Sequence, residues 1–218
     1  MDTFEAIRTR RSIRSYLPKK IPDEVLFAIL DAGHHAPAAW NFTNWRFLVV
    51  ETEEKKKVIA KAALRQEWIA KAPVVLIVCS EPGALVREGG ERAKKLFQIQ
   101  NVAAAVENML LAAHDFRVAS CWVGAFTEPL LRKEFQIHDD AEIHAIIPLG
   151  YSNERPKTPS RPAFSEVTFF ERWENQDRVV TAPSPLARSK TLGEHLEERK
   201  NSISKKIKSA AGKLRKKK

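Results

Sequence analysis

The sequence predicts one layered domain of the α/β or α+β class. Segments with the composition of buried strands alternate along the chain with segments of helical periodicity, and this alternation is typical of layered folds. The 218 residues suffice for one domain with an appendage, and a 44% share of hydrophobic residues suffices for a core. The two cysteines, Cys79 and Cys121, exclude a disulfide scaffold and favour a reducing compartment.

The spacing of apolar residues predicts strands and helices over most of the chain. Three short apolar runs predict strands at 47–50, 73–79 and 142–149. Helical spacing predicts helices at 2–9, 23–32, 53–63, 91–117 and 128–135, and a short one at 68–71. We expect Asp23 to cap the second helix and residues 33–44 to form a loop. The second half of 91–117 has almost no polar face, which predicts burial at the domain centre or at a subunit interface.

The basic charge of the chain is confined to its C-terminal part. The formal net charge is +10, yet residues 1–177 carry equal numbers of acidic and basic side chains. We therefore expect a domain over 1–177 and a basic extension over 178–218. An apolar stripe begins at Leu192, so the extension is either an amphipathic helix or disordered.

Three roles are open for this extension. It could pack on the body of a dimer, or bind an anionic membrane surface or an acidic partner, or bind nucleic acid. The chain has no aromatic residue after Trp173, which argues against base stacking and so against nucleic acid.

Several function classes are disfavoured by what the sequence lacks. No apolar run is long enough to span a bilayer, and the N-terminus has no signal-peptide core, so we expect a cytoplasmic protein. The body has no G-x-G-x-x-G, P-loop or G-x-S-x-G motif. The histidines have no metal-ligand spacing, so we expect no metal site.

A cluster of cations near the N-terminus offers a site for an oxyanion. Arg10, Arg11 and Arg14 place three guanidinium groups within five residues, and Ser12 adds a hydroxyl. Arginine can donate two parallel hydrogen bonds to phosphate oxygens. The alternative interpretation is a solvated basic loop.

Three further segments are candidates for ligand contact. Small residues around Trp40 and Asn41 would allow close approach of a flat ligand, although Trp40 could simply plug the core. Gly124 ends an apolar stretch at which backbone N–H groups could face a ligand, although a strand end is the simpler interpretation. Prolines around Lys157 and Arg161 could hold a cation in one place. The chemistry best supported is binding of an organic phosphate cofactor.

Taken together, these motifs resemble the nitroreductase family of FMN-dependent oxidoreductases. They occur in the order and spacing of that family within residues 2–173: IRTRRSIRSY at 7–16, APAAWN at 36–41, WRF at 45–47, APVV at 72–75, VENMLLAA at 106–113, WVG at 122–124, and PLGY at 148–151 with Arg161. Where the family often has serine, this chain has Ala38 and Ala39, so contacts there would fall to the backbone.

The resemblance implies an α+β sandwich with a mostly antiparallel sheet, which works as an intertwined homodimer with two FMN sites at its interface. Arg10 and Ser12 would hold the FMN phosphate with Arg11 beside it, and Arg161 would close on the phosphate. Arg14 would reach the pyrimidine edge of the flavin. A fixed cation there would stabilise the negative charge of the reduced flavin.

The remaining contacts implied by the resemblance come from three places. One group would come from the partner chain: Pro37, Ala38, Ala39, Trp40 and Asn41. Val123 and Gly124 would face the dimethylbenzene–N5 side of the flavin, and Gln66 would supply a polar contact. Residues 82–95 occupy the stretch that covers the active site in the family.

The implied reaction is a ping-pong cycle. NADH or NADPH would give a hydride to flavin N5, and a nitroaromatic, a quinone or a similar flat small molecule would then take the electrons. No side chain need act as a nucleophile. Two alternatives stay open: a flavoenzyme of the same fold with other chemistry, such as reductive dehalogenation or flavin destruction, and a non-catalytic flavin-binding protein directed by its basic tail.

Overall fold

The computed structural model describes residues 1–176 of the chain. These residues fall into two compact units, one spanning Arg10–Thr158 and the other combining Met1–Thr9 with residues 159–176. The second of these contains α1 (Thr3–Thr9) and a short 3-10 turn, η4 (Phe164–Glu166). The predicted basic extension, 178–218, lies outside the described residues, so its boundary and its role stay predictions.

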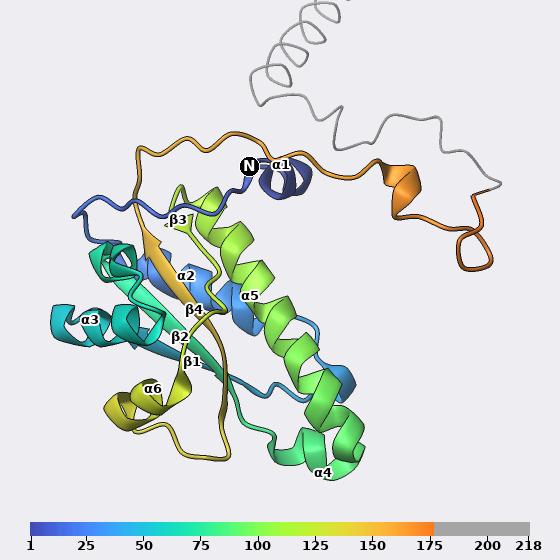
Figure 1. Cartoon of the computed structure of the whole chain (residues 1–218), viewed down its shortest axis with the longest axis horizontal. Helices are drawn as coiled ribbons and strands as arrows, with labels where there is room; N and C mark the ends of the chain where they lie inside the picture. The colour runs from blue at the N-terminus through green and yellow to red at the C-terminus, as the bar shows by residue number, and fades with distance from the viewer. Residues whose placement is uncertain (177–218) are drawn as a thin grey trace, which may run out of the picture. The chain divides into compact units, whose positions relative to one another are not determined.

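The unit Arg10–Thr158 is built on a four-stranded antiparallel sheet with the strand order β1-β2-β4-β3 (Figure 1). The strands are β1 (Trp45–Val50), β2 (Val74–Ser80), β3 (Ala119–Ser120) and β4 (Glu142–Gly150). The helices are α2 (Asp23–His34), α3 (Glu53–Ala62), α4 (Gly83–Arg92), α5 (Gln98–Asp115) and α6 (Glu128–Phe135). The antiparallel sheet with flanking helices confirms the predicted α+β class.

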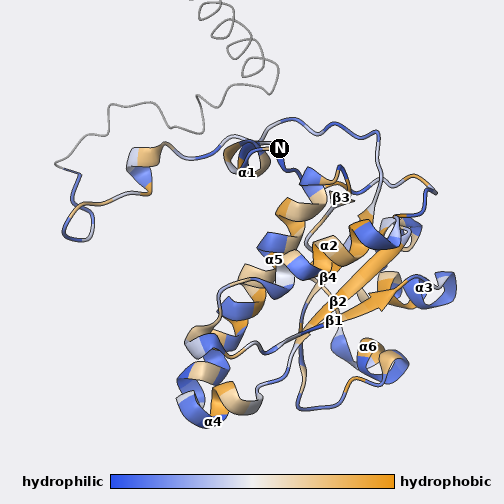
Figure 2. Ribbon diagram, turned by 180° about the vertical axis from the view of Figure 1, so that it is seen from behind, coloured by the Kyte–Doolittle hydropathy of each residue, from blue (hydrophilic) through white to orange (hydrophobic). Residues whose placement is uncertain are grey.

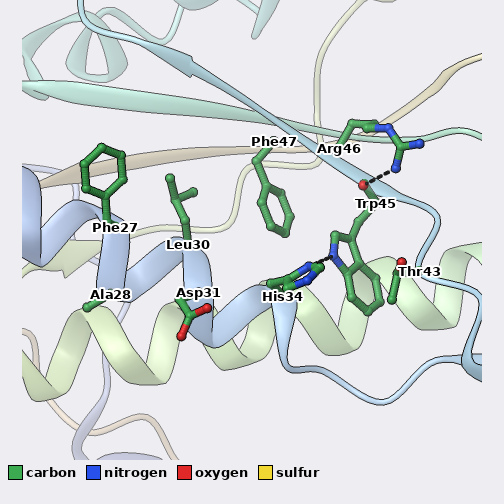
Figure 3. Close-up of a pocket in the computed structure, with 9 residues that line it drawn as sticks. All are labelled: Phe27, Ala28, Leu30, Asp31, His34, Thr43, Trp45, Arg46 and Phe47. Carbon is green, nitrogen blue, oxygen red and sulfur yellow. Dashed lines mark hydrogen bonds between the residues drawn. The ribbon is translucent and has the colours of Figure 1, made fainter.

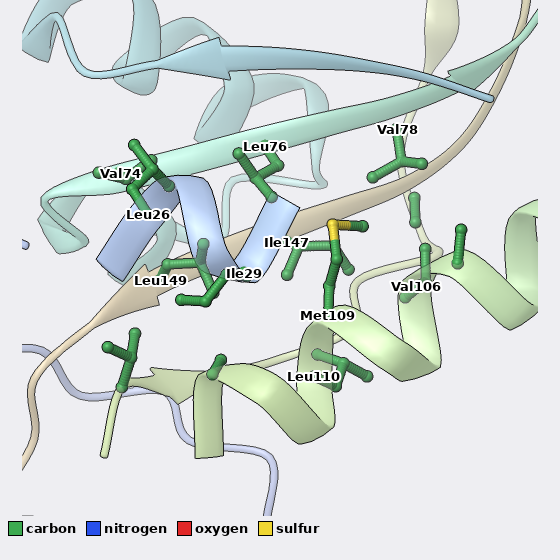
Figure 4. Packing of buried hydrophobic residues seen from close by; sticks show 14 of the residues in the cluster. Leu26, Ile29, Val74, Leu76, Val78, Val106, Met109, Leu110, Ile147 and Leu149 are labelled. Atoms are coloured by element: carbon green, nitrogen blue, oxygen red, sulfur yellow. The ribbon is translucent and has the colours of Figure 1, made fainter. Parts of the chain in front are cut away.

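Each face of the sheet carries its own hydrophobic core, because side chains alternate along a strand. On β2, Val74, Leu76 and Val78 point toward α2 and α5, with Met109 of α5 among them (Figure 4). The intervening β2 residues Val75 and Ile77 pack with α3, α6 and the 3-10 turn η2 (Glu67–Lys71). This two-sided burial explains the unbroken apolar run of β2 in the sequence, and Figure 2 shows the strongly hydrophobic strands between helices with polar outer faces.

The structure corrects three details of the predicted elements. Pro22, not Asp23, is the N-cap of α2, and Asp23 begins the helix as an acidic residue of its first turn. The predicted loop 33–44 starts later because α2 continues through His34, and it contains a 3-10 turn, η1 (Ala39–Asn41). The predicted helix 91–117 is in fact three elements: the end of α4, a π-helical turn η3 (Ala93–Phe97), and α5.

The region predicted to cover the active site, 82–95, is largely helical because α4 and η3 fill it. Helical periodicity is weak there, since only Leu85 of α4 is buried. Gly90 has a φ of 55°, a left-handed conformation that kinks α4 and that favours glycine. Glycine is a poor helix former, which is why the sequence did not indicate a helix at this point.

Candidate functional site

The arginine cluster is fixed to the sheet by its backbone. Ser12 forms a parallel bridge with Ser120 of β3, and the Ile13 N–H donates to the Ser120 carbonyl at 2.9 Å. The buried Tyr16 hydroxyl donates to the Ile13 carbonyl at 2.7 Å. The fold therefore brings two predicted site segments together, the arginine cluster and the stretch that leads to Gly124.

A third segment, just beyond β4, contacts the same cluster. An Nη atom of Arg11 donates to Thr158 Oγ1 at 2.7 Å, and the Arg14 backbone N–H donates to a Glu154 carboxylate oxygen at 3.1 Å. Sequence reasoning assigned no role to Thr158 or Glu154. The partners are 147 and 140 residues apart along the chain, so no local pattern could have indicated these contacts.

The electrostatics of this region show a concentration of positive charge. Burial lowers the pKa of His114, in the last turn of α5, and the charges of Arg10, Arg11 and Arg117 lower it further. Burial raises the pKa of the Cys121 thiol, while Arg14, a hydrogen bond with Ser12, and Arg10 act in the opposite direction. The His114 imidazole and the Cys121 thiol are thus both influenced by the arginine cluster. Arg117 adds a cation that was not among the arginines predicted from sequence.

In the stretch after β3, a buried residue bonded to the sheet, Val123, is followed by an exposed glycine, Gly124. Val123 is buried and exchanges two backbone hydrogen bonds with Ile146 of β4, at 2.9 and 3.0 Å. Gly124 follows and is exposed, and a Cβ placed on it would meet no atom within 4 Å. The backbone at Gly124 therefore leaves space in which a flat ligand can approach.

Aromatic rings lie beside Arg14. The Arg14 guanidinium stands 5.8 Å from the centre of the Trp68 ring, and Tyr16 stacks on Trp68 at 6.4 Å between ring centres. Trp68 belongs to η2 and was not predicted as a site residue. Gln66 is half-buried two residues earlier and its side-chain amide donates to the Ala63 carbonyl at 3.0 Å, so its contact with a flavin stays a prediction.

The segment from Pro37 to Asn41 lies elsewhere, beside the first turn of α5. The Ala39 N–H donates to Asn101 Oδ1 at 2.9 Å, and Trp40 packs edge-on against Phe97. Pro37, Trp40 and Asn41 are exposed, whereas Ala38 and Ala39 are half-buried. Trp40 is 58% exposed and therefore does not plug the core, which removes that alternative.

The two groups of predicted site residues are therefore separated within one chain. Asn101 holds the 37–41 segment at one end of α5, and His114 lies within the field of the arginine cluster at the other end. Thirteen residues of helix at a 1.5 Å rise make this separation about 20 Å.

Arg161 belongs to the other unit and is exposed. Its predicted contact with a phosphate stays a prediction.

An open groove of about 760 Å³ lies between α2 and β1 (Figure 3). It is lined mainly by Phe27, Leu30, His34, Trp45 and Phe47, and it contains none of the predicted site residues. Within residues 1–176, no helix is long and apolar enough to cross a membrane, and no group of His, Cys, Asp or Glu side chains could hold a metal ion.

The donors present at the arginine cluster fit FMN. Guanidinium groups and a hydroxyl suit a phosphate, Arg14 supplies a cation beside aromatic rings, and the space at Gly124 suits a flat ring system. These residues come from three segments that the fold brings together.

Comparison with known proteins agrees with this description. The model of the Nitroreductase family matches residues 7–67 and 57–151. A protein of Methanothermobacter thermautotrophicus named "Putative NADH dehydrogenase/NAD(P)H nitroreductase" is 35% identical over 164 residues, which cover 72% of this chain and 81% of that protein.

A match over part of the chain and a solved structure give further similarity to this family. The FMN reductase [NAD(P)H] of Bacillus subtilis is 34% identical over 80 residues, covering 37% of this chain and 32% of that protein. The crystal structure of a nitroreductase family protein from Clostridium novyi NT superposes with a TM-score of 0.65 at 26% identity, covering 80% of this chain and 96% of that one. The chain therefore belongs to the nitroreductase family.

Proposed function

We propose that this protein is an FMN-dependent NAD(P)H oxidoreductase that acts as a homodimer, with each flavin site completed by both copies. The observation that carries the proposal is the separation of the two groups of site residues along α5. A second copy of the chain can bring its own 37–41 segment to the arginine cluster of the first. Relatives named NAD(P)H nitroreductase and FMN reductase support the same activity.

The phosphate end of the proposed site is a set of charged donors. Arg10 and Ser12 hold the FMN phosphate, Arg11 lies beside it, and Arg161 closes on it. The bond from Arg11 to Thr158 and the bridge from Ser12 to Ser120 hold Arg11 and the Ser12 backbone in place before any ligand binds. Such preorganisation reduces the entropy that binding would otherwise cost.

Arg14 acts at the ring end of the proposed site. Bound FMN would supply the redox chemistry, namely acceptance of a hydride from NAD(P)H and delivery of the electrons to a flat acceptor such as a nitroaromatic or a quinone. The Arg14 guanidinium holds a positive charge where the pyrimidine edge of the ring becomes negative. Arg14 is held in place by the Trp68 ring beside its guanidinium and by the hydrogen bond from its backbone N–H to a Glu154 carboxylate oxygen.

The partner's segment supplies shape and polarity, not acid–base groups. The segment offers the exposed Trp40 ring and the exposed Asn41 amide side chain to the flavin of the other copy, while the Ala39 N–H is already bonded to Asn101 Oδ1. The nicotinamide and, after it has left, the acceptor would use one space over the flavin in turn, which makes the proposed cycle ping-pong.

The absorption spectrum of the purified protein tests the proposed activity. We expect a flavin band near about 450 nm, either as purified or after reconstitution with FMN, that bleaches on addition of NADH or NADPH under nitrogen. It should return when a nitroaromatic or a quinone is added. A protein that stays colourless after incubation with FMN would overturn the proposal.

A further inference from the structure

The turn at Ala39–Asn41 holds an unusual backbone. Trp40 has a φ of 50° and Asn41 a φ of 61°, so two successive residues with side chains occupy the left-handed region. Side chains disfavour this region, and it is rarely occupied by a bulky residue. Such a conformation persists only where surrounding groups hold it.

One side chain bonds to both flanks of this pair. Asn101 Oδ1 accepts from the Ala39 N–H at 2.9 Å, and Asn101 Nδ2 donates to the Phe42 carbonyl at 3.2 Å and to Asn44 Oδ1 at 2.9 Å. Asn101 is only 4% exposed. A carboxamide combines an acceptor and two donors, and all three positions are used here.

The Trp40 ring packs against residues of α4 and η3. It lies edge-on to Phe97 at 5.5 Å between ring centres, and a Cβ placed on Gly89 would come within 2.6 Å of the ring. Only the absence of a side chain at Gly89 allows this close approach. Asn101 thus fixes the backbone of the turn while α4 and η3 support its aromatic side chain, which is still more than half exposed.

We infer that Asn101 is the positioning residue of the flavin site: it sets the 37–41 segment in its receptive conformation before the flavin of the partner copy binds. This inference rests on the proposed function, because it takes FMN as the ligand. If the segment moved among several conformations, the apparent affinity would fall in proportion to the fraction in the receptive one. Asn101 does not touch the flavin in this account and acts through the segment alone.

The test compares Asn101→Ala with a matched control on the same helix. Asn108 is also on α5 and donates from Nδ2 to a backbone carbonyl, that of Ala32, at 3.1 Å. Asn108→Ala therefore removes a hydrogen bond of the same kind without touching the 37–41 segment. Two measurements are made on the full-length protein: amide hydrogen exchange at Ala39, and the Kd for FMN by quenching of flavin fluorescence.

We expect Asn101→Ala to speed exchange at Ala39 and to weaken FMN binding, each by about tenfold, with the dimer fraction unchanged by light scattering. Asn108→Ala should leave both values near those of the parent protein. Asn101→Asp preserves the volume of the side chain and the acceptor for Ala39, so it tests the donating half even if Asn101→Ala fails to fold. It should weaken binding as well, because a carboxylate cannot donate to the Phe42 carbonyl.

The outcomes separate the inference from the proposed function. Parent protein that does not bind FMN overturns the proposed function and with it the ligand assigned to the segment. Parent protein that binds FMN, together with an Asn101→Ala variant of unchanged Kd or unchanged exchange at Ala39, overturns the inference alone. Loss of affinity in Asn108→Ala as large as in Asn101→Ala also overturns it, since the effect would then belong to α5 in general.

Discussion

Arg14 and Arg161 are both arginines, but we assign them different roles in the proposed site. Arg14 stands beside Trp68 and is assigned to the flavin ring, whereas Arg161 is assigned to the phosphate. A cation at the ring end changes the stability of the reduced flavin, while a cation at the phosphate changes mainly affinity.

We therefore expect Arg14→Ala to slow flavin reduction by NAD(P)H more than Arg161→Ala does, when both variants are saturated with FMN. Stopped-flow absorbance under nitrogen measures this rate directly. Arg14→Lys retains a positive charge and serves as the control, so it should recover part of the loss. Equal reduction rates in the Arg14→Ala and Arg161→Ala variants would contradict the assigned roles.

Gly124 and Gly33 form a second contrast at the residue scale. A Cβ at Gly124 would meet nothing within 4 Å, whereas a Cβ at Gly33 would stand 2.6 Å from Met109 Cγ in the core. We expect Gly124→Val to weaken FMN binding about tenfold and to leave the melting temperature unchanged, because the new side chain occupies the ligand's space.

Gly33→Ala is the matched control and should destabilise the fold by about 1–3 kcal/mol through overpacking, without a direct effect on the site. Thermal unfolding and FMN titration on both variants separate the two effects. A Gly124→Val variant with the parent Kd would show that no ligand lies against this backbone.

At the scale of elements, the interior of the sheet holds a polar pair that responds to pH. Ser80 of β2 lies 2.7 Å from His144 Nε2 of β4, and burial lowers the pKa of His144 from the ordinary value of 6.5. The unfolded chain therefore binds a proton more readily than the folded chain. The contribution of neutral His144 to the free energy of unfolding is therefore fully present above pH 6.5. It is lost as the pH falls below 6.5 toward and through the lower pKa of the folded protein.

Urea unfolding at pH 7.5 and pH 5.5 measures this effect. We expect the parent protein to lose more stability between the two values than a His144→Gln variant, which has no proton to gain at that position. His114, whose pKa is also lowered, contributes in the same direction and is present in both proteins. An equal loss in the two proteins would contradict the assignment to His144.

Elements with strong local patterns could be predicted from sequence, and those made by distant contacts could not. The apolar run of β2 and the periodicity of α2 were sufficient, because burial on both faces or on one face produces a recognisable pattern in the sequence. α4 left little mark, since Leu85 is its one buried residue and three of its ten residues are glycines. The role of Asn101 depends on partners about 60 residues away along the chain.

The candidate site divides in the same way. Arg10, Ser12 and Arg14 stand out as a local motif, and the family resemblance adds 37–41 and Gly124. Trp68 and Glu154 join them through the fold alone, because their contacts with Arg14 link segments far apart in sequence. Arg117 joins them through its charge, which lowers the pKa of His114 together with the charges of Arg10 and Arg11. The separation of the site into two groups needs the position of both ends of α5, which only the fold supplies.

At the scale of the whole molecule, each proposed flavin site is shared by two copies of the chain. If the first chain of a mixed dimer lacks a working arginine cluster and the second lacks a working 37–41 segment, one site loses both halves. The other site then keeps both halves intact. Were each site instead built within one chain, both sites of the mixed dimer would be defective.

The most direct measurement is therefore FMN binding by such a mixed dimer. Arg10→Glu would disable the cluster in one chain, and the double change Trp40→Ala, Asn41→Ala would disable the segment in the other, with the two chains purified together by different tags. Each homodimer should bind FMN at least about tenfold more weakly than the parent protein. We predict that the mixed dimer binds one FMN with the parent Kd. A mixed dimer with no site of parent affinity would contradict the shared site.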